Sequence, residues 1–207
     1  KIAIGRRLHE LINPVTQRAT AAFEPALDYV VAKIPRWPFD KFRKAERTIG
    51  TQMKATGEVM AIDRSFEGAL QKAVRSLETD AKDLLWEDAN WSPVQILELV
   101  RRPNDLRLWA LCAALRRGSE VELLHDLSKI DRWFLWKLAA IVGMEQRLTA
   151  EPVTPELLWD AKRSGFSDAT IARLAQRPES EIRSEREHAV MFPVYKMVDT
   201  CAGEFAA

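Results

Sequence analysis

Apolar side chains between residues 66 and 77 recur at intervals of three and four positions, which is the spacing of one face of an α-helix. The polar residues Gln71, Lys72 and Arg75 fall on the opposite side. Ser65, just before the first apolar position, can cap the helix by accepting a hydrogen bond from a free backbone N–H. The pattern therefore predicts an amphipathic helix with one buried stripe. That stripe consists of Phe66, Ala69, Leu70, Ala73, Val74 and Leu77.

Two short runs of β-forming residues precede this helix. Residues 28–34 alternate in character and are expected to stop at Pro35, and residues 57–62 lead directly into the helix. We expect the two runs to pair as antiparallel strands. Because a pair of strands alone is marginally stable in water, we interpret them as the edge of a larger α/β domain.

After residue 77 the pattern becomes helical. Ser92-Pro93-Val94-Gln95 is a typical helix start, with a serine cap, a proline in the first turn and a glutamine that closes the capping box. The ends of the chain add an expected helix at 1–12 and a strand-like run at 194–200. We therefore predict a mainly α fold, a helical bundle preceded by a small β-containing part. Further helices are expected at 105–117, 120–126, 129–147, Thr154 to Gly165, 167–176, and Pro178 to just before Pro193.

The expected helix at 129–147, with Ser128 as its cap, carries more apolar residues than one buried stripe needs. Leu135 and Trp136 lie off the main stripe, as does Val142. A helix that is apolar on most sides is usually buried among neighbours or placed at an interface. Our hypothesis is that Leu135 and Trp136 contact another subunit. The main stripe consists of Ile130, Trp133, Phe134, Leu138 and Ile141.

Composition narrows the classes of partner. The chain has 207 residues, of which 47% are hydrophobic, and 31 basic residues nearly balance 30 acidic ones. A net charge of +1 gives no general attraction to nucleic acid or anionic membrane, and the longest apolar run, at 108–115, is too short to span a bilayer. Cys112 and Cys201 are expected to be reduced thiols of a cytoplasmic protein. Lys1, rather than Met, leads us to expect a piece of a longer chain.

Candidate catalytic groups are few. The 8 glycines form no phosphate-binding loop, and the sequence has no CxxC or His pair at metal spacing, so we expect no catalytic, cofactor or metal residue. Cys112 and His125 are the residue types of a catalytic cysteine–histidine pair, but the favoured interpretation of Cys112 is a thiol in the core. Glu58 and Asp63 flank the second strand, and we interpret them as a solvated edge and a helix-start charge rather than as nucleotide or metal ligands.

Residues 161–176 offer an alternative function. The order helix, glycine, serine cap and Thr-Ile-x-Arg is typical of a DNA-reading helix-turn-helix, with Thr170 and Arg173 facing the groove. The alternative is thus a nucleic-acid-binding protein that uses residues 156–176. A helical corner inside a bundle explains the same pattern, and the near-zero net charge argues against phosphate binding.

Five segments of the chain point to a known family. They are FEPALDYVVAKIPR at 23–36, TQMKATGEVMAIDRSFEGALQKAVRSLE at 51–78, IDRWFL at 130–135, GFSDATIARL at 165–174 and PVYKMVDTCAGEF at 193–205. In these segments, and in their order, the chain resembles the large subunit of glutamine-dependent carbamoyl-phosphate synthetase. Asp63 stands where that family usually has Gly, and Gly68 and Gly203 replace a usual Glu and Ala.

The resemblance implies a division into three parts. Residues 1–78 would be the end of the first, carboxyphosphate-forming ATP-grasp half, residues 79–192 the helical oligomerisation domain, and residues 193–207 the start of the linker into the second half. The family's motifs for ATP, Mg²⁺ (or Mn²⁺) and bicarbonate match no position here. The fragment is therefore expected to be an inactive spacer and subunit-contact module.

The same resemblance implies the partners. They are the other domains of the large chain, a glutaminase small subunit and further copies of the chain, with no nucleic acid and no membrane. The parent enzyme would be a cytoplasmic ligase that makes carbamoyl phosphate from bicarbonate, glutamine-derived ammonia and two ATP, for arginine and pyrimidine synthesis.

Overall fold

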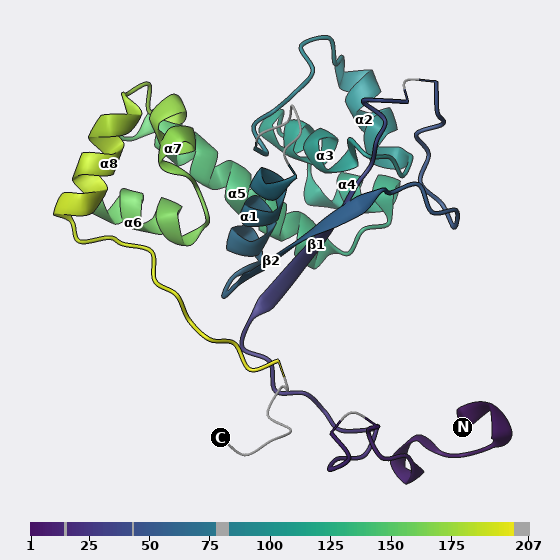
Figure 1. Ribbon diagram of the computed structural model, residues 1–207. Coiled ribbons are helices and arrows are strands. Elements are labelled where there is room, and N and C mark those ends of the chain that lie inside the picture. Colours follow the sequence, from purple (N-terminus) through teal and green to yellow (C-terminus); the bar gives the residue numbers. More distant parts are fainter. Residues whose placement is uncertain (15, 43, 78–82, 201–207) are drawn as a thin grey trace. The chain divides into compact units, whose positions relative to one another are not determined.

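The computed structural model describes residues 1–14, 16–42, 44–77 and 83–200. The chain divides into two compact units. One contains residues 30–192, and the other contains residues 1–29 together with 193–207. Figure 1 shows the larger unit as a short sheet, a helix that covers it, and a group of further helices. In the described parts of the chain the architecture is mainly α with one small sheet, as the sequence predicted.

The sheet has two antiparallel strands, β1 (Val30–Arg36) and β2 (Gly57–Asp63). Their register pairs Val30 with Asp63 and Arg36 with Gly57, which confirms the predicted pairing. Pro35 does not stop β1 but lies inside it. Proline is tolerated there because β1 pairs on one side only, so the missing N–H removes no bond to a second neighbour.

Helix α1 (Phe66–Ser76) covers one face of this sheet. Ser65 caps it by accepting a hydrogen bond from the Gly68 N–H at 3.1 Å. The predicted stripe is buried, since Ala69, Ala73 and Val74 are almost fully shielded from solvent. The buried stripe therefore joins the sheet to the rest of the helical core.

Three of the remaining helices begin at a local sequence signal. The Ser92–Gln95 capping box begins α2 as predicted, Thr154 and Ser167 cap α6 and α7, and a left-handed Gly165 follows α6. The helices are α2 (Pro93–Arg101), α3 (Arg107–Arg116), α4 (Val121–Ser128), α5 (Arg132–Ala150), α6 (Pro155–Arg163), α7 (Asp168–Leu174) and α8 (Glu179–His188).

The long helix α5 begins later than predicted. Ser128 is the last residue of α4, and its hydroxyl donates to the Leu124 carbonyl. Lys129 then adopts a left-handed conformation with φ of 60°, which ends α4, and Asp131 caps α5 instead. The sequence predicted two separate helices but placed the start of α5 too early, because the residue that makes the turn between them is not a glycine.

Two predictions about the chain ends are wrong. Residues 1–12 form short 3₁₀ turns at Ile2–Ile4 and Leu8–Glu10 rather than a helix, and their apolar side chains are exposed. Residues 194–199 are extended but pair with no strand among the described residues. A short helix or a single strand is unstable unless its apolar side is buried, and most apolar side chains of these two stretches are exposed.

Candidate interdomain junction

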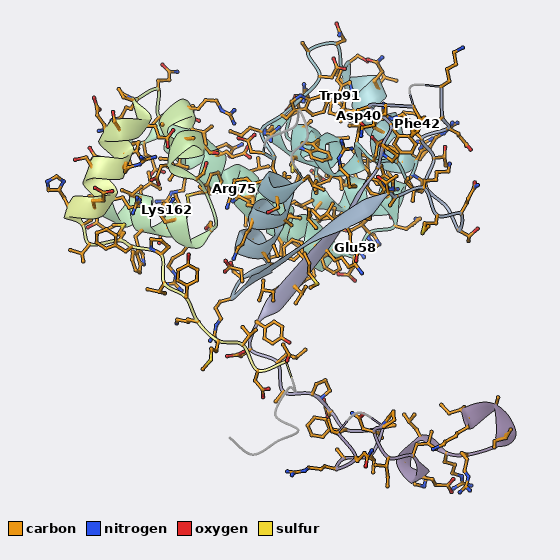
Figure 2. The ribbon with its side chains drawn as sticks, in the orientation of Figure 1. Asp40, Phe42, Glu58, Arg75, Trp91 and Lys162 are labelled. Atoms are coloured by element: carbon orange, nitrogen blue, oxygen red, sulfur yellow. The ribbon has the colours of Figure 1, made fainter. Side chains whose placement is uncertain are left out.

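Helix α1 is tied to the turn between α6 and α7 by two side chains spaced one helical turn apart. Gln71 Nε2 donates to the Ser164 carbonyl at 2.7 Å, and Arg75 Nη1 donates to the Gly165 carbonyl at 2.7 Å. Residues four apart share one face of a helix, so both reach the same turn. Figure 2 shows Arg75 on α1 on the side that faces these helices. We call this contact the α1 clamp.

The α1 clamp corrects one detail of the sequence interpretation. Gln71 was placed on the polar side of α1, yet it is only 4% exposed. The α6–α7 turn covers it and supplies the acceptor that its amide needs, because a buried polar group without a partner costs free energy. The Gln71 side of α1 is therefore a second contact surface, while Lys72 and Ser76 on the polar face remain exposed.

A close backbone approach makes the α1 clamp possible. Gly165 has φ of 91°, and a β-carbon on it would lie 2.8 Å from the Cα of Gly68. A β-carbon on Gly68 would lie 2.8 Å from the Asp63 carboxyl carbon. Gly165 needs glycine because backbone atoms occupy the space of a side chain, whereas a side chain at Gly68 would require the side chains of Asp63 and Ser65 to move.

The segment that follows the α1 helix is also pinned to the bundle. The Asp83 carbonyl accepts from Trp109 Nε1 at 3.0 Å, and its carboxylate accepts from Thr170 Oγ1 at 3.3 Å and pairs with Arg173. These contacts connect residue 83 to α3 and to α7. The chain is thus held against the helical bundle at Asp83.

A partly buried ionic network fixes α3 against α5. Arg116 Nε donates to Glu145 Oε2 at 2.7 Å, and the same guanidinium pairs with Glu87 and donates to the Leu84 carbonyl. Burial raises the pKa of the Glu145 carboxyl, and the hydrogen bond from Arg116 opposes that shift. The network holds residues 84–87 and both helices in one arrangement.

The proposed subunit-contact residues have different environments. Leu135 is fully buried in the helical core, so it offers no surface to another subunit, whereas Trp136 is 60% exposed. Trp133 and Phe134, assigned to the buried stripe, are instead 50% and 44% exposed. The buried stripe differs from the predicted one because α5 meets its neighbours through Leu135, Leu138 and Val142.

The remaining candidate groups have structural partners. Cys112 is buried, which raises its pKa to about 12, so it holds no reactive thiolate. His125 Nδ1 lies 2.7 Å from the Ile130 carbonyl. Glu58 pairs with Lys33 at 3.0 Å on the exposed side of the sheet, and Asp63 accepts from the Arg64 N–H at 2.7 Å. The interpretation of Cys112 as a core thiol is confirmed, while Cys201 lies outside the described residues.

The helix-turn-helix alternative finds no support. Thr170 is buried, and its hydroxyl bonds to Ser167 and Asp83, while Arg173 pairs with Asp83. Neither side chain is free to read a base. The corner formed by α6 and α7 is therefore part of the bundle.

A cavity of about 380 Å³ lies between the end of β1 and the start of α3. Trp37, Phe39, Trp86 and Trp109 contribute to its walls. Its arginines already have carboxylate partners, Arg36 with Asp40 and Arg47 with Asp105. In the parts of the chain that the structure describes, no group of His, Cys, Asp or Glu is placed to hold a metal ion, and no helix is long and apolar enough to cross a bilayer.

Comparisons with known proteins agree with this helical architecture. A family model described as the oligomerisation domain of the carbamoyl-phosphate synthetase large chain matches residues 58–190, from β2 to just beyond α8. The chain belongs to the carbamoyl-phosphate synthetase large-chain family. The large chain of Thermomicrobium roseum is 62% identical over 208 residues, and that of Caldanaerobacter subterraneus subsp. tengcongensis is 54% identical over 206 residues.

These large-chain relatives are much longer than the chain. The alignments cover 100% and 99% of this chain but only 19% of each relative. The chain thus corresponds to about a fifth of a large chain. The resemblance found from the sequence alone is confirmed at the level of the family.

Proposed function

We propose that this chain is the central spacer of a carbamoyl phosphate synthase large chain. Residues 1–78 would end the first ATP-grasp half, residues 79–192 would form the oligomerisation domain, and residues 193–207 would lead into the second half. The parent enzyme would make carbamoyl phosphate from bicarbonate, glutamine-derived ammonia and two ATP in the cytoplasm, for arginine and pyrimidine synthesis. It would use Mg²⁺ or Mn²⁺ and a glutaminase small subunit, and the isolated chain would be inactive.

The α1 clamp is the observation that carries the spacer role. It joins Gln71 and Arg75, which would belong to the first half, to Ser164 and Gly165 at the far end of the helical domain. The proposed boundary at residue 78 then separates two parts that pack together in one compact unit. Such a contact holds the two ends of the spacer at a fixed separation.

Paired substitution of the α1 clamp tests this role in the full-length large chain. In Gln71→Ala/Arg75→Ala, we expect overall carbamoyl phosphate synthesis to fall at least about tenfold, because misplacement far from the chemistry can cost that much or more. Bicarbonate-dependent ATP hydrolysis, which needs only the first half, should change little. Ser76→Ala is the control, since that hydroxyl bonds to the Lys72 carbonyl in the same helix. Equal losses in both activities, or no loss in either, would contradict the proposal.

Self-association through α5 is the second part of the proposal. Trp136 is its exposed anchor, and the matching model describes an oligomerisation domain. Light scattering of Trp136→Glu should give a lower mass than the parent large chain, because a charge in an interface core is poorly tolerated. Trp159→Glu is the control, since the Trp159 side chain on α6 is also about half exposed. An unchanged mass, where the parent associates, rejects Trp136 as an anchor.

A further inference from the structure

Three aromatic side chains at the starts of α1 and α5 contact one another but remain open on one side. We call Phe66, Trp133 and Phe134 the aromatic surface. The ring centroids are 5.4 Å apart for Phe66–Trp133, 5.6 Å for Phe66–Phe134 and 5.0 Å for Trp133–Phe134. These are the separations of a packed core, yet Trp133 is 50% exposed and Phe134 is 44% exposed. Contiguous exposed aromatics of this kind mark interaction surfaces.

The aromatic surface is held in place before any partner arrives. Lys137 Nζ lies 5.4 Å from the Trp133 ring centroid, and the same ammonium pairs with Glu67 at 3.1 Å. Trp133 is therefore fixed by a cation–π contact as well as by its two aromatic neighbours. A surface fixed in this way loses little conformational entropy on binding.

The aromatic surface lies beside the incomplete sheet. Phe66 is the third residue after Asp63, the last residue of β2, so the two are at most roughly 10 Å apart along the chain. The face of the sheet away from α1 exposes Val31 and Met60, and no third strand pairs with either edge among residues 30–42, 44–77 and 83–192. A domain that extends this sheet from the end of β2 comes next to the aromatic rings.

We infer that, in the full-length large chain, the aromatic surface packs against the domain that completes the β1–β2 sheet, with Trp133 as the central contact residue. This inference rests on the proposed function, because it requires a longer chain. The aligned residues make up only 19% of the Thermomicrobium roseum large chain. The occupant presents an apolar patch of the same polypeptide, and the contact fixes the first half of the enzyme on the end of α5. The aromatic surface is thus an intramolecular domain contact rather than a contact between copies of the chain.

Oxidative footprinting of the tryptophans in the full-length large chain tests the inference. The oxidation rate of each indole in the native protein is divided by its rate in the urea-unfolded protein. Trp159, 48% exposed on α6, is the matched control for Trp133. Trp133 should be protected at least about tenfold more than Trp159, because a ring in a desolvated interface core is shielded from solvent. Protection of Trp133 that is no greater than that of Trp159 would overturn the inference.

Dilution separates the two possible occupants. Protection by a domain of the same chain is independent of concentration, whereas protection by a second copy disappears as the oligomer dissociates. A loss of Trp133 protection on dilution would therefore overturn the inference of an intramolecular contact. Because footprinting does not depend on turnover, an unprotected Trp133 in an active synthase defeats only this inference. A protected Trp133 in a chain without synthase activity defeats only the proposed function.

Discussion

Gly165 and Gly68 meet backbone to backbone, so that a β-carbon on Gly165 would lie 2.8 Å from the Gly68 Cα. This approach brings the carbonyls of Ser164 and Gly165 within reach of Gln71 and Arg75. The two glycines are 97 positions apart in the sequence, and only the fold brings them together.

Replacement of Gly165 by alanine should strongly destabilise the fold. The substitution places a side chain at φ of 91° and drives its β-carbon into backbone. We expect the free energy of unfolding to fall by about 2–4 kcal/mol in a urea titration. Gly118→Ala is the matched control, since Gly118 has φ of 81° but no atom within 4 Å of an added β-carbon. Equal losses for the two variants would show that the approach to Gly68 contributes nothing.

Asp63 and Gly68 should be energetically coupled. The Asp63 carboxylate, together with the Ser65 hydroxyl, occupies the space that a Gly68 side chain would fill. Asp63→Gly and Gly68→Glu should each destabilise the fold, the first by loss of the hydrogen bond to the Arg64 N–H and the second by steric overlap.

The double variant should recover stability relative to the sum of the single variants. A double-mutant cycle of unfolding free energies should give a coupling of about 1–3 kcal/mol, as for residues in direct contact. Lys33→Ala, on the far face of the sheet, combined with Gly68→Glu is the control cycle and should be additive. A coupling near zero for Asp63 and Gly68 would contradict the steric argument.

Asp168 should make the stability of the α6–α8 helices depend on acid pH. Burial raises the pKa of its carboxyl, but Lys162 at 2.7 Å and Arg186 at 3.0 Å outweigh this effect and leave the pKa below its ordinary value. A folded-state pKa below the unfolded value contributes stability at neutral pH that is lost as the pH falls through the folded pKa.

Asp168→Asn should therefore be less stable than the parent chain at pH 7, by about 1–3 kcal/mol. The difference should shrink below about pH 4, where the carboxyl of the unfolded chain becomes protonated, and should vanish as the pH falls through the lower pKa of the folded chain. Thermal unfolding followed by circular dichroism across this range measures it. Asp160→Asn, at a more exposed carboxylate 3.8 Å from Arg147, is the control and should give a small difference. A difference for Asp168→Asn that does not change with pH would contradict the prediction.

Cys112 should be unreactive in the folded chain. Its side chain is fully buried on α3, and burial raises its pKa to about 12, so the thiolate is scarce at neutral pH. In a Cys201→Ser background, a thiol reagent at pH 8 should modify Cys112 only when urea is added. Modification in native buffer as fast as in urea would show that the α3 core opens readily.

The starts of four helices could be predicted because their signals are local. A cap residue bonds an N–H two or three positions ahead, so Ser65, Ser92, Thr154 and Ser167 identify helix starts without knowledge of the fold. The start of α5 was missed because two local cap signals compete there. Ser128 and Asp131 are both acceptable caps, and the left-handed turn at Lys129, which chooses between them, has no glycine to mark it.

The candidate site was less predictable. Trp136 was correctly placed off the buried stripe of α5, but Leu135 was placed there as well and is buried. Trp133 and Phe134 are apolar at helical spacing, so their sequence positions do not distinguish a buried residue from an exposed one. Gln71 and Arg75 gave no signal at all, because polar residues opposite an apolar stripe usually face solvent.

The sequence by itself determined the family, the mainly helical class, the β1–β2 pairing and most helix boundaries, since each depends on residue order over short distances or on extended similarity. The tertiary structure alone decided which polar side chains are buried, how Gly68 meets Gly165, and which end of α5 remains uncovered. Those features depend on contacts between residues far apart in the chain, and hydrophobic periodicity records which side of a helix is apolar but not what packs against the other side.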